Sequence, residues 1–449
     1  MDWTKLLSSN DFFNENKRSD IDLSRSPFQR DFDRIIFSEN FRRLDKKTQV
    51  HPLKDNDHVH SRLPHSLEVS CVGRSLGSEV GKRLVNDYKM NPFGDIHDSV
   101  VPILTGQIVQ SACLAHDIGN PPFGHAGEEL IQEWFRKYFI ANGNENLEET
   151  EKDDLMNFEG NAQAFRVLTK LAMSRNKGGI QATSAVVGSM LKYPWAFSKT
   201  LTKSKFCAFT SEIPELKTLA ETCGLKSSDK TPNSYSRHPF AFLSEAADDI
   251  CYNLMDLEDA YELHILNFNE VTDVFLGFFQ NRKNFDADKY LSPKSKQSIS
   301  HLRAMAVSEC VNAVVEEFFD KYSEILRGDL PHSHNLIENC NPKIADTMKE
   351  AKRLSHDKVF TTDRKTLLEI SANTTLSTLL DHFCGAAYEV INNKKPSGNS
   401  TRLLKLMGEN SPSSSDSLYS AYQKVTDYIS GMTDNYAVKI AKHLNGIVD

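Results

Sequence analysis

The sequence has little of what marks a secreted or a membrane-spanning protein. Its eight cysteines are scattered over 449 residues and none forms a CxxC pair, so we expect no disulfide framework and a reducing environment. The longest uncharged run, residues 99–115, includes Pro102 and Gln110 and is too short and too polar to span a bilayer. The opening MDWTKLLSSN is too polar for a signal peptide. We therefore expect a cytoplasmic protein with no membrane partner.

Excess positive charge is missing as well. The formal net charge is −8, which excludes a global basic footprint for nucleic acid but leaves room for a local basic patch. Alternating patterns typical of strands are rare, and the best candidate is KFCAFTSE around Phe206. The acidic, polar stretch 142–157 is expected to be a surface loop.

Apolar residues recur instead at helical spacing. Stripes at three- and four-residue steps run from His65 to Val80, from Leu243 to Tyr261 and from Phe165 to Ala172. Residues 99–115 are typical of a buried core helix. The pattern predicts an all-α fold with at most a small β-hairpin.

The stretch SACLAHDIGNPPFGHAGEEL, residues 111–130, joins an apolar helix to several titratable residues. His116 and Asp117 stand where a Gly and two Pro residues end the helical pattern, and His125 and Glu128 follow. Adjacent residues of a regular helix point about 100° apart, so they rarely share a ligand except where the helix ends. Imidazole and carboxylate together suit a divalent cation. Alone, the His-Asp pair is a weak signal.

Other parts of the chain could complete such a site. His65 lies on an apolar stripe, where a core histidine is the ordinary interpretation. Asp248, Tyr252, Asp256 and Asp259 recur at steps of four, four and three, so they share one helix face. A solvated face is the ordinary interpretation there too, but carboxylates on a mostly apolar helix are costly to bury unless paired or bound to metal. His65, His116, Asp117 and Asp248 could supply a site with two His and two Asp ligands.

The order of these residues resembles that of the HD-domain phosphohydrolases and, more closely, of the bacterial deoxyguanosine triphosphate triphosphohydrolases. The matching segments follow in family order and span residues 26–438, while residues 183–235 and 261–421 show little likeness. The segments are SPFQRDFDRIIFSENFRRLDKKTQV, SRLPHSLEV, HDIGNPPFGHAGEE, NFEGNAQAFRVL, SRHPFAFLSEAADDICY and YISGMTDNYAV.

The resemblance implies how the chain is organised and where a metal binds. It implies one unit over residues 1–449, with an HD-domain helical core over 60–275 and a helical C-terminal region over 276–449. Of two adjacent aspartates, Asp248 is implied as the ligand and Asp249 as a neighbour, because the family keeps a Tyr four residues on and an Asp eight residues on. The implied ligands for Mg²⁺ or Mn²⁺ are His65, His116, Asp117 and Asp248.

The resemblance also implies the reaction, which is hydrolysis of dGTP, with other dNTPs as candidates, to deoxynucleoside and tripolyphosphate by attack of water on the α-phosphorus. The departing 5′-oxygen needs a proton, which a histidine can supply near neutral pH. His125 stands at the matching position, and Glu128, one helical turn on, could orient it. Related enzymes that bind further metals often have another His where this chain has Asn120, which favours one strong metal site.

Substrate contacts are implied residue by residue. Tyr252 would pack under the sugar and leave no room for a 2′-OH, and Gln49 and Asp256 would bind the 3′-OH. Arg62 is implied as a phosphate contact, with Lys205 a weaker candidate. Asn161 would line the pocket or, alternatively, cap a helix.

Two other readings remain open from the sequence. One is another HD-type nucleotide phosphohydrolase, either a nucleotidase or a phosphodiesterase. The other is a nucleotide-sensing or single-strand nucleic-acid-binding protein with a decayed site, against which the complete set of four ligands argues. The resemblance further implies a homo-oligomer, with a hexamer as one candidate, and allows binding of single-stranded nucleic acid. Base preference and activation by dNTPs stay open.

Overall fold

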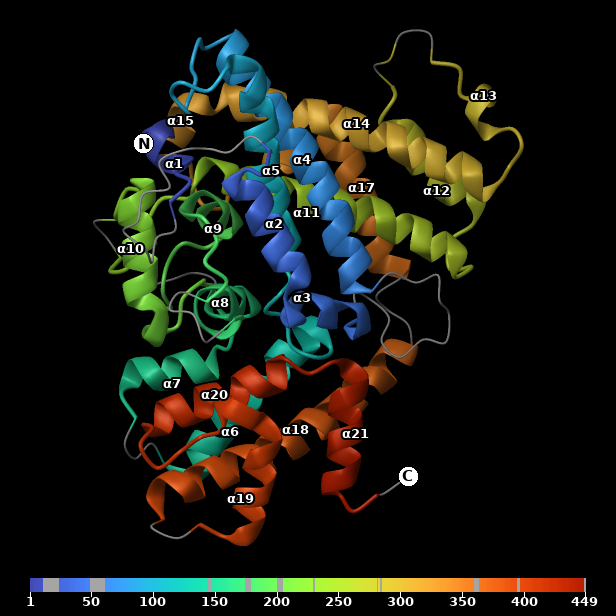
Figure 1. Ribbon diagram of the computed structural model, residues 1–449. Coiled ribbons are helices and arrows are strands. Elements are labelled where there is room, and N and C mark those ends of the chain that lie inside the picture. Colours follow the sequence, from blue (N-terminus) through green and yellow to red (C-terminus); the bar gives the residue numbers. More distant parts are fainter. Residues whose placement is uncertain are drawn as a thin grey trace.

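The chain folds into helices that are stacked in two groups (Figure 1). This computed structural model describes residues 1–10, 24–48, 61–143, 147–173, 179–199, 205–228, 231–280, 282, 285–358, 363–393 and 396–447. Within these ranges there is no β-strand, only isolated bridges such as Ala196 with Ala208, so the all-α prediction is confirmed. Among the described helices, none combines the length and apolar character needed to cross a membrane.

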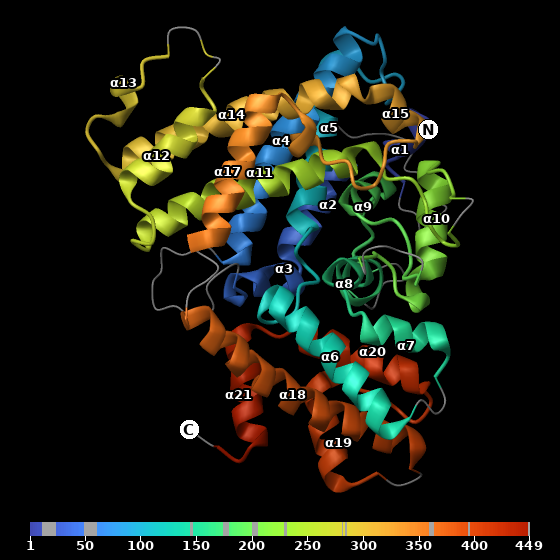
Figure 2. The same cartoon turned by 180° about the vertical axis from the view of Figure 1, so that it is seen from behind.

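Each group of helices encloses its own apolar core, and the two views of the fold agree on this division (Figures 1 and 2). The large core is built or covered by α1 (Trp3–Leu6), α2 (Pro27–Phe37), α3 (Glu39–Arg43), α4 (Arg62–Asn86), α5 (Val101–Ala115), α9 (Ser184–Met190), α10 (Ile213–Cys223), α11 (Pro239–Glu262), α12 (Phe268–Gly277), α13 (Asp288–Leu291), α14 (Lys296–Asp320), α15 (Tyr322–Arg327), α16 (Leu336–Asn339) and α17 (Pro342–Lys358).

The small core is formed by a mid-chain helix pair and the C-terminal helices. Its helices are α6 (Gly124–Asn142), α7 (Glu149–Met156), α18 (Asp363–Asn392), α19 (Gly398–Leu404), α20 (Leu418–Ser430) and α21 (Asp434–Leu444). Between the two cores lies α8 (Gly160–Arg166), which gives Ala162 to the small core and Phe165 to the large one. The short helices η1 (Leu44–Lys46), η2 (Asp98–Val100), η3 (Val167–Leu171), η4 (Thr210–Glu212) and η5 (Lys405–Asn410) complete the fold.

The helices α4 and α5 pack closely and bring predicted metal ligands together. Gly73, Gly77 and Gly81 form a stripe on α4 that lies directly against α5, and a Cβ at Gly77 would stand 2.6 Å from the Thr105 carbonyl oxygen. The contacts of Gly73 are with later residues of α5 than those of Gly81, so the two helices run antiparallel. The beginning of α4 therefore lies beside the end of α5.

The three predicted helical stripes are confirmed, and each has a clear physical role. The stripe from His65 to Val80 is the buried face of α4, and the stripe from Leu243 to Tyr261 lies on α11, which packs against both α4 and α5. The third stripe begins on α8 and continues through a single π-helical turn, η3. All eight cysteines are free, and only Cys71 is exposed.

Two local expectations from the sequence were wrong. The polar stretch 142–157 contains α7, which begins with a capping box between Glu148 and Glu151 and buries Leu155 in the small core. The alternating segment around Phe206 forms a single bridge instead of a strand, because both Phe206 and Phe209 turn into the small core.

Candidate active site

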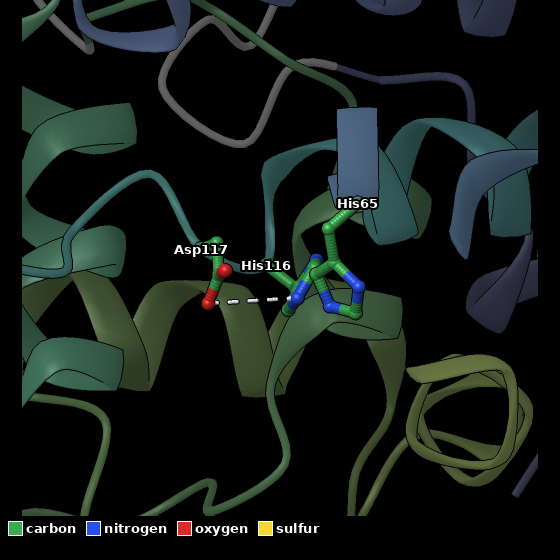
Figure 3. Close-up of side chains that lie close together, drawn as sticks. All are labelled: His65, His116 and Asp117. Carbon is green, nitrogen blue, oxygen red and sulfur yellow. Dashed lines mark ion pairs between the residues drawn. The ribbon is translucent and has the colours of Figure 1, made fainter. Parts of the chain in front are cut away.

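Three helices bring two histidines and two aspartates together. His65 lies in the first turn of α4, and His116 and Asp117 directly follow α5 (Figure 3). One ligand atom from each of these three residues lies within 4.8 Å of the others. Asp248, from the middle of α11, faces the same point, since its Oδ1 lies 3.0 Å from His65 Nε2 and 3.5 Å from His116 Nε2. Imidazole and carboxylate donors of this kind suit a divalent cation.

The position of His116 at the end of α5 fixes its tautomer. Its Nδ1 lies 2.7 Å from the carbonyl oxygen of Cys113 in the last turn of α5, which also accepts a hydrogen bond from the His116 amide at 3.4 Å. Nδ1–H donates to this oxygen, so in the neutral ring the lone pair is on Nε2. That atom faces Asp117 Oδ1 at 3.5 Å, the contact drawn in Figure 3. A backbone acceptor on the far nitrogen is the usual support of a metal-binding histidine.

The charges at the site are strongly coupled. Burial alone would lower the pKa of His116, but the carboxylates of Asp117 and Asp248 raise it above its ordinary value. Burial would raise the pKa of Asp117, yet Arg62 and the two histidines hold it well below its usual range. The pKa of Asp248 is also lowered, against burial, by His116 and His65. Both carboxylates are therefore ionised, which leaves negative charge available to a cation.

Asp117 is held from two further sides. Arg62 Nη1 donates to its Oδ2 at 2.7 Å, and the Asn120 side-chain amide donates to its Oδ1. Arg62 is only 5% exposed, and its Nε has no hydrogen-bond partner among the described residues. Arg62, the predicted phosphate contact, thus also orients Asp117, a predicted metal ligand. The buried Nε of Arg62 remains a donor for a bound group.

A second group of titratable residues forms around the beginning of α6. His125 Nδ1 lies 3.3 Å from Glu128 Oε2, and the two side chains differ sharply, at 81% and 4% exposed. Lys205 Nζ lies 3.2 Å from Glu128 Oε2 and 2.7 Å from Glu159 Oε2. Glu128 is thus buried with two basic partners, and it presents His125 to solvent.

The pKa values in this group are shifted in consistent directions. The hydrogen bond that His125 donates to the Glu128 carboxylate raises the pKa of His125. Burial would raise the pKa of Glu128, but His125 and Lys205 lower it. Burial would likewise lower the pKa of Lys205, but the carboxylates of Glu128 and Glu159 raise it. His125 therefore keeps its proton to a higher pH than a free histidine.

The turn after α5 connects the two groups. Gly119 lies so close to α8 that a Cβ there would stand 2.1 Å from the amide nitrogen of Ala164. The Gly160 amide, at the beginning of α8, donates to Glu128 Oε1 at 3.0 Å. The turn after α5, helix α8 and the His125–Glu128 pair are therefore packed as one unit.

The remaining predicted contacts are placed on α11, on α8 and outside the described residues. Tyr252 lies one turn beyond Asp248 on α11 and is half-buried, and Asp256 lies a further turn on and is buried. The pKa of Tyr252 is raised, mainly by burial and secondly by the nearby Asp256 carboxylate. Asn161 donates its side-chain amide to Glu159 at 2.5 Å. The N-cap of α8 is Glu159, so the alternative reading of Asn161 as a cap was wrong. Gln49 lies outside the described residues.

No sequence pattern indicated the residues that support the turn after α5. Lys47 is 3% exposed and donates from Nζ to the carbonyl oxygens of Asn120 and Ser430, each at 2.6 Å. Burial lowers the pKa of Lys47 to about 7. Lys47 belongs to a sequence stretch rich in Lys and Arg, where no periodicity distinguishes the one buried ammonium from its solvated neighbours.

Comparison with known proteins identifies two family regions in the chain. Residues 62–174 match the HD domain, a range that includes His65, His116 and Asp117 but not Asp248, and residues 339–443 match the phosphohydrolase-associated domain.

Relatives that match over nearly their whole length are named deoxyguanosinetriphosphate triphosphohydrolase or deoxyguanosinetriphosphate triphosphohydrolase-like protein. The chain is 42% identical to a deoxyguanosinetriphosphate triphosphohydrolase-like protein of Pseudomonas aeruginosa over 99% of both chains. It is 36% identical to a protein of the same name from Synechocystis over the whole of both chains. It is 29% identical to a deoxyguanosinetriphosphate triphosphohydrolase of Yersinia pseudotuberculosis over 91% of this chain and 92% of the relative.

Proposed function

We propose that this chain, which belongs to the deoxyguanosinetriphosphate triphosphohydrolase-like proteins of the HD-domain phosphohydrolases, hydrolyses dNTPs, dGTP among them, to deoxynucleoside and tripolyphosphate. The observation that carries the proposal is the convergence of His65, His116 and Asp117 within 4.8 Å, beside an exposed, carboxylate-bonded His125. A cation site and a proton donor are the two chemical requirements for expelling a poor alkoxide leaving group.

His65, His116, Asp117 and Asp248 would hold a divalent cation, Mg²⁺ or Mn²⁺. Their chemistry fits such an ion, because two ionised carboxylates and at least one imidazole with a directed Nε2 face one point. When bound there, the ion would lower the pKa of a water molecule and polarise a phosphoryl oxygen. Arg62 and Asn120 keep the carboxylate of Asp117 in place for this role.

The chain's own residues would manage the proton. The oxygen of a water molecule would bond to the α-phosphorus as the bond from that phosphorus to the 5′-oxygen breaks. The oxygen from water leaves in the tripolyphosphate, and the proton that the water sheds goes to solvent, from which His125 is protonated again. His125 would give its proton to the departing 5′-oxygen, so that the deoxynucleoside leaves neutral. Glu128 supports this step because its hydrogen bond raises the pKa of His125 and so keeps the imidazole protonated.

Binding and selection of the substrate would fall to the residues around this centre. The buried Nε of Arg62 and the ammonium of Lys205 would contact phosphate oxygens. Tyr252, Asp256 and Gln49 would bind the deoxyribose, with the ring of Tyr252 filling the space of a 2′-OH. Asn161 would line the pocket beside Glu159.

Product analysis tests the proposal directly. The protein is incubated with each dNTP and each rNTP in the presence of Mg²⁺ or Mn²⁺, and the products are separated. We expect deoxynucleoside and tripolyphosphate in equal amounts from dGTP, and little turnover of GTP. Inorganic phosphate from a nucleoside monophosphate would indicate a nucleotidase instead, and opening of a cyclic nucleotide would indicate a phosphodiesterase. Nucleotide binding without any product would indicate a sensing or nucleic-acid-binding protein.

We also propose an oligomeric state and a cellular location for this protein. We expect a homo-oligomer, with a hexamer as one candidate, acting on the dNTP pool of the cytoplasm. Light scattering on the purified chain measures the number of subunits, and a gel-shift titration with single-stranded DNA measures whether nucleic acid binds.

A further inference from the structure

One buried carboxylate from the C-terminal region reaches the turn that leads into α6, the helix that carries His125. Asp434 is the first residue of α21 and is 2% exposed. Its Oδ1 accepts a hydrogen bond from the Phe123 amide at 3.0 Å. Its Oδ2 accepts from the amide and the hydroxyl of Thr48 at 3.0 and 2.6 Å. A single side chain therefore ties three segments together.

The bond to Phe123 acts at a sensitive point of the turn. Phe123 is the N-cap of α6 and has φ +65°, a conformation uncommon for a residue other than glycine. N-terminal amides of a helix have no partner within the helix, and the side chain of Phe123 cannot accept a hydrogen bond. Asp434 supplies that acceptor from outside, with a negative charge that also suits the positive end of the α6 dipole. His125 follows two residues later.

Lys47 strengthens the same connection. Its ammonium bridges the carbonyl oxygens of Asn120, in the turn, and Ser430, at the end of α20. The turn over residues 120–123 is thus fixed at both ends by the segment 430–434. This segment belongs to YISGMTDNYAV, a family-like stretch of the sequence that has no part in the proposed metal site.

We propose that Asp434 is a positioning residue for hydrolysis, which sets His125 against the departing 5′-oxygen by holding the Phe123 amide. The inference rests on the proposed function, because it assigns Asp434 a role through His125. It makes the C-terminal region part of the reaction centre, since α21 controls the geometry at the beginning of α6.

The test is a double-mutant cycle on kcat with Asp434→Asn and His125→Ala. Asparagine keeps the shape but has one acceptor oxygen where three donors converge, so at least one of the hydrogen bonds is lost. We expect kcat for dGTP to fall by about 10- to 100-fold with KM changed less than about threefold, the size of effect that a small misplacement of a reacting group produces. In the His125→Ala background the same change should cost less than about threefold, because the step it supports is already lost.

A role in stability alone gives a different pattern. It predicts the same fold loss in both backgrounds, and this result would overturn the inference. Asp416→Asn is the matched control, because among the described residues the Asp416 carboxylate contacts local groups such as Lys424, and the change should leave kcat unchanged. If Asp434→Asn does not fold, Asp434→Glu, which keeps both acceptor oxygens on a longer arm, takes its place in the cycle with the same two outcomes.

Failure of the inference is separable from failure of the proposed function. Wild-type protein that releases no tripolyphosphate would contradict the function itself. An active wild type with an equally active His125→Ala would contradict the role of His125 and, with it, that of Asp434. An active wild type, a strongly impaired His125→Ala and additive losses with Asp434→Asn would overturn the positioning role alone.

Discussion

Asp248 Oδ1 lies 3.0 Å from His65 Nε2, although 183 residues separate the two along the chain. The contact places a carboxylate of α11 opposite an imidazole of α4, and His116 lies 3.5 Å from the same oxygen.

His116→Ala and Asp117→Ala should each abolish metal binding. Each change removes a donor atom from a group within 4.8 Å, and the supporting contacts to Cys113 and Arg62 cannot replace it. Elemental analysis after dialysis measures the metal content, and full occupancy in both variants would refute the assignment. His356→Ala, a change at an exposed histidine, is the control and should bind metal as the wild type does.

Tyr252→Ala should relax the choice of sugar. If the ring fills the space of a 2′-OH, its removal admits ribose, and kcat/KM for GTP should rise relative to that for dGTP by about 10-fold or more. Tyr252→Phe keeps the ring and should keep the selectivity. An unchanged ratio in Tyr252→Ala would mean that the ring serves packing only.

His125→Ala should keep the metal and lose about 10²- to 10⁴-fold in kcat, the usual worth of a positioned acid or base. The double variant with Glu128→Ala should lose much less than the product of the single losses, because the two residues act as a pair. A substrate analogue with a less basic leaving atom at the 5′ position should rescue His125→Ala selectively. Nearly full activity of His125→Asn would instead assign the histidine to packing.

Glu128→Gln should move the alkaline limb of the rate profile. The Glu128 carboxylate raises the pKa of His125, whereas Lys205 and Arg62 oppose it. If His125 must be protonated to act, the rate is full below its pKa and falls as pH rises through it. Loss of the carboxylate lowers that pKa, so the fall should begin at a lower pH. If the alkaline fall of kcat/KM occurs at the same pH in Glu128→Gln and the wild type, the group that titrates there is not His125.

Lys47 should make stability rise with pH. Burial lowers its pKa in the folded protein to about 7, against 10.5 for an exposed lysine, so between these values the unfolded chain binds more protons. The cost of the buried ammonium is fully present below pH 7 and is relieved as pH rises above it. The free energy of unfolding of the wild type should gain about 1–3 kcal/mol relative to Lys47→Met between pH 6 and pH 9. Parallel curves for the two proteins, from urea unfolding at each pH, would contradict the shift.

Local periodicity predicts the helices well because apolar burial sets their phase. The stripe from His65 to Val80 is the buried face of α4, and His65 is both a core-facing residue and a member of the cluster. Where local signals compete, the sequence misleads: residues 149–156 are polar enough for a loop, yet a capping box and the burial of Leu155 make them helical. Glu159, not Asn161, caps α8.

The supporting contacts of the site could not be predicted from the sequence. Asp434 meets Phe123 across 311 positions, and Lys47 meets Ser430 across 383. Neither residue lies on a distinctive pattern, because a hydrogen bond between distant segments depends on how two whole cores are packed. The resemblance to a family supplied the ligand set, since spacing alone left His65 and Asp248 with ordinary structural explanations.

The glycine stripe of α4 has a consequence for the predicted metal ligands. Because α4 and α5 touch backbone to backbone at Gly77, their axes lie close together, and the rings of His65 and His116 at the neighbouring helix ends have centroids 5.4 Å apart. The row of glycines on α4 therefore sets how far apart the two rings stand. A side chain added at Gly77 would push the two helices apart, so we expect such a change to separate the His65 and His116 rings without contacting either of them.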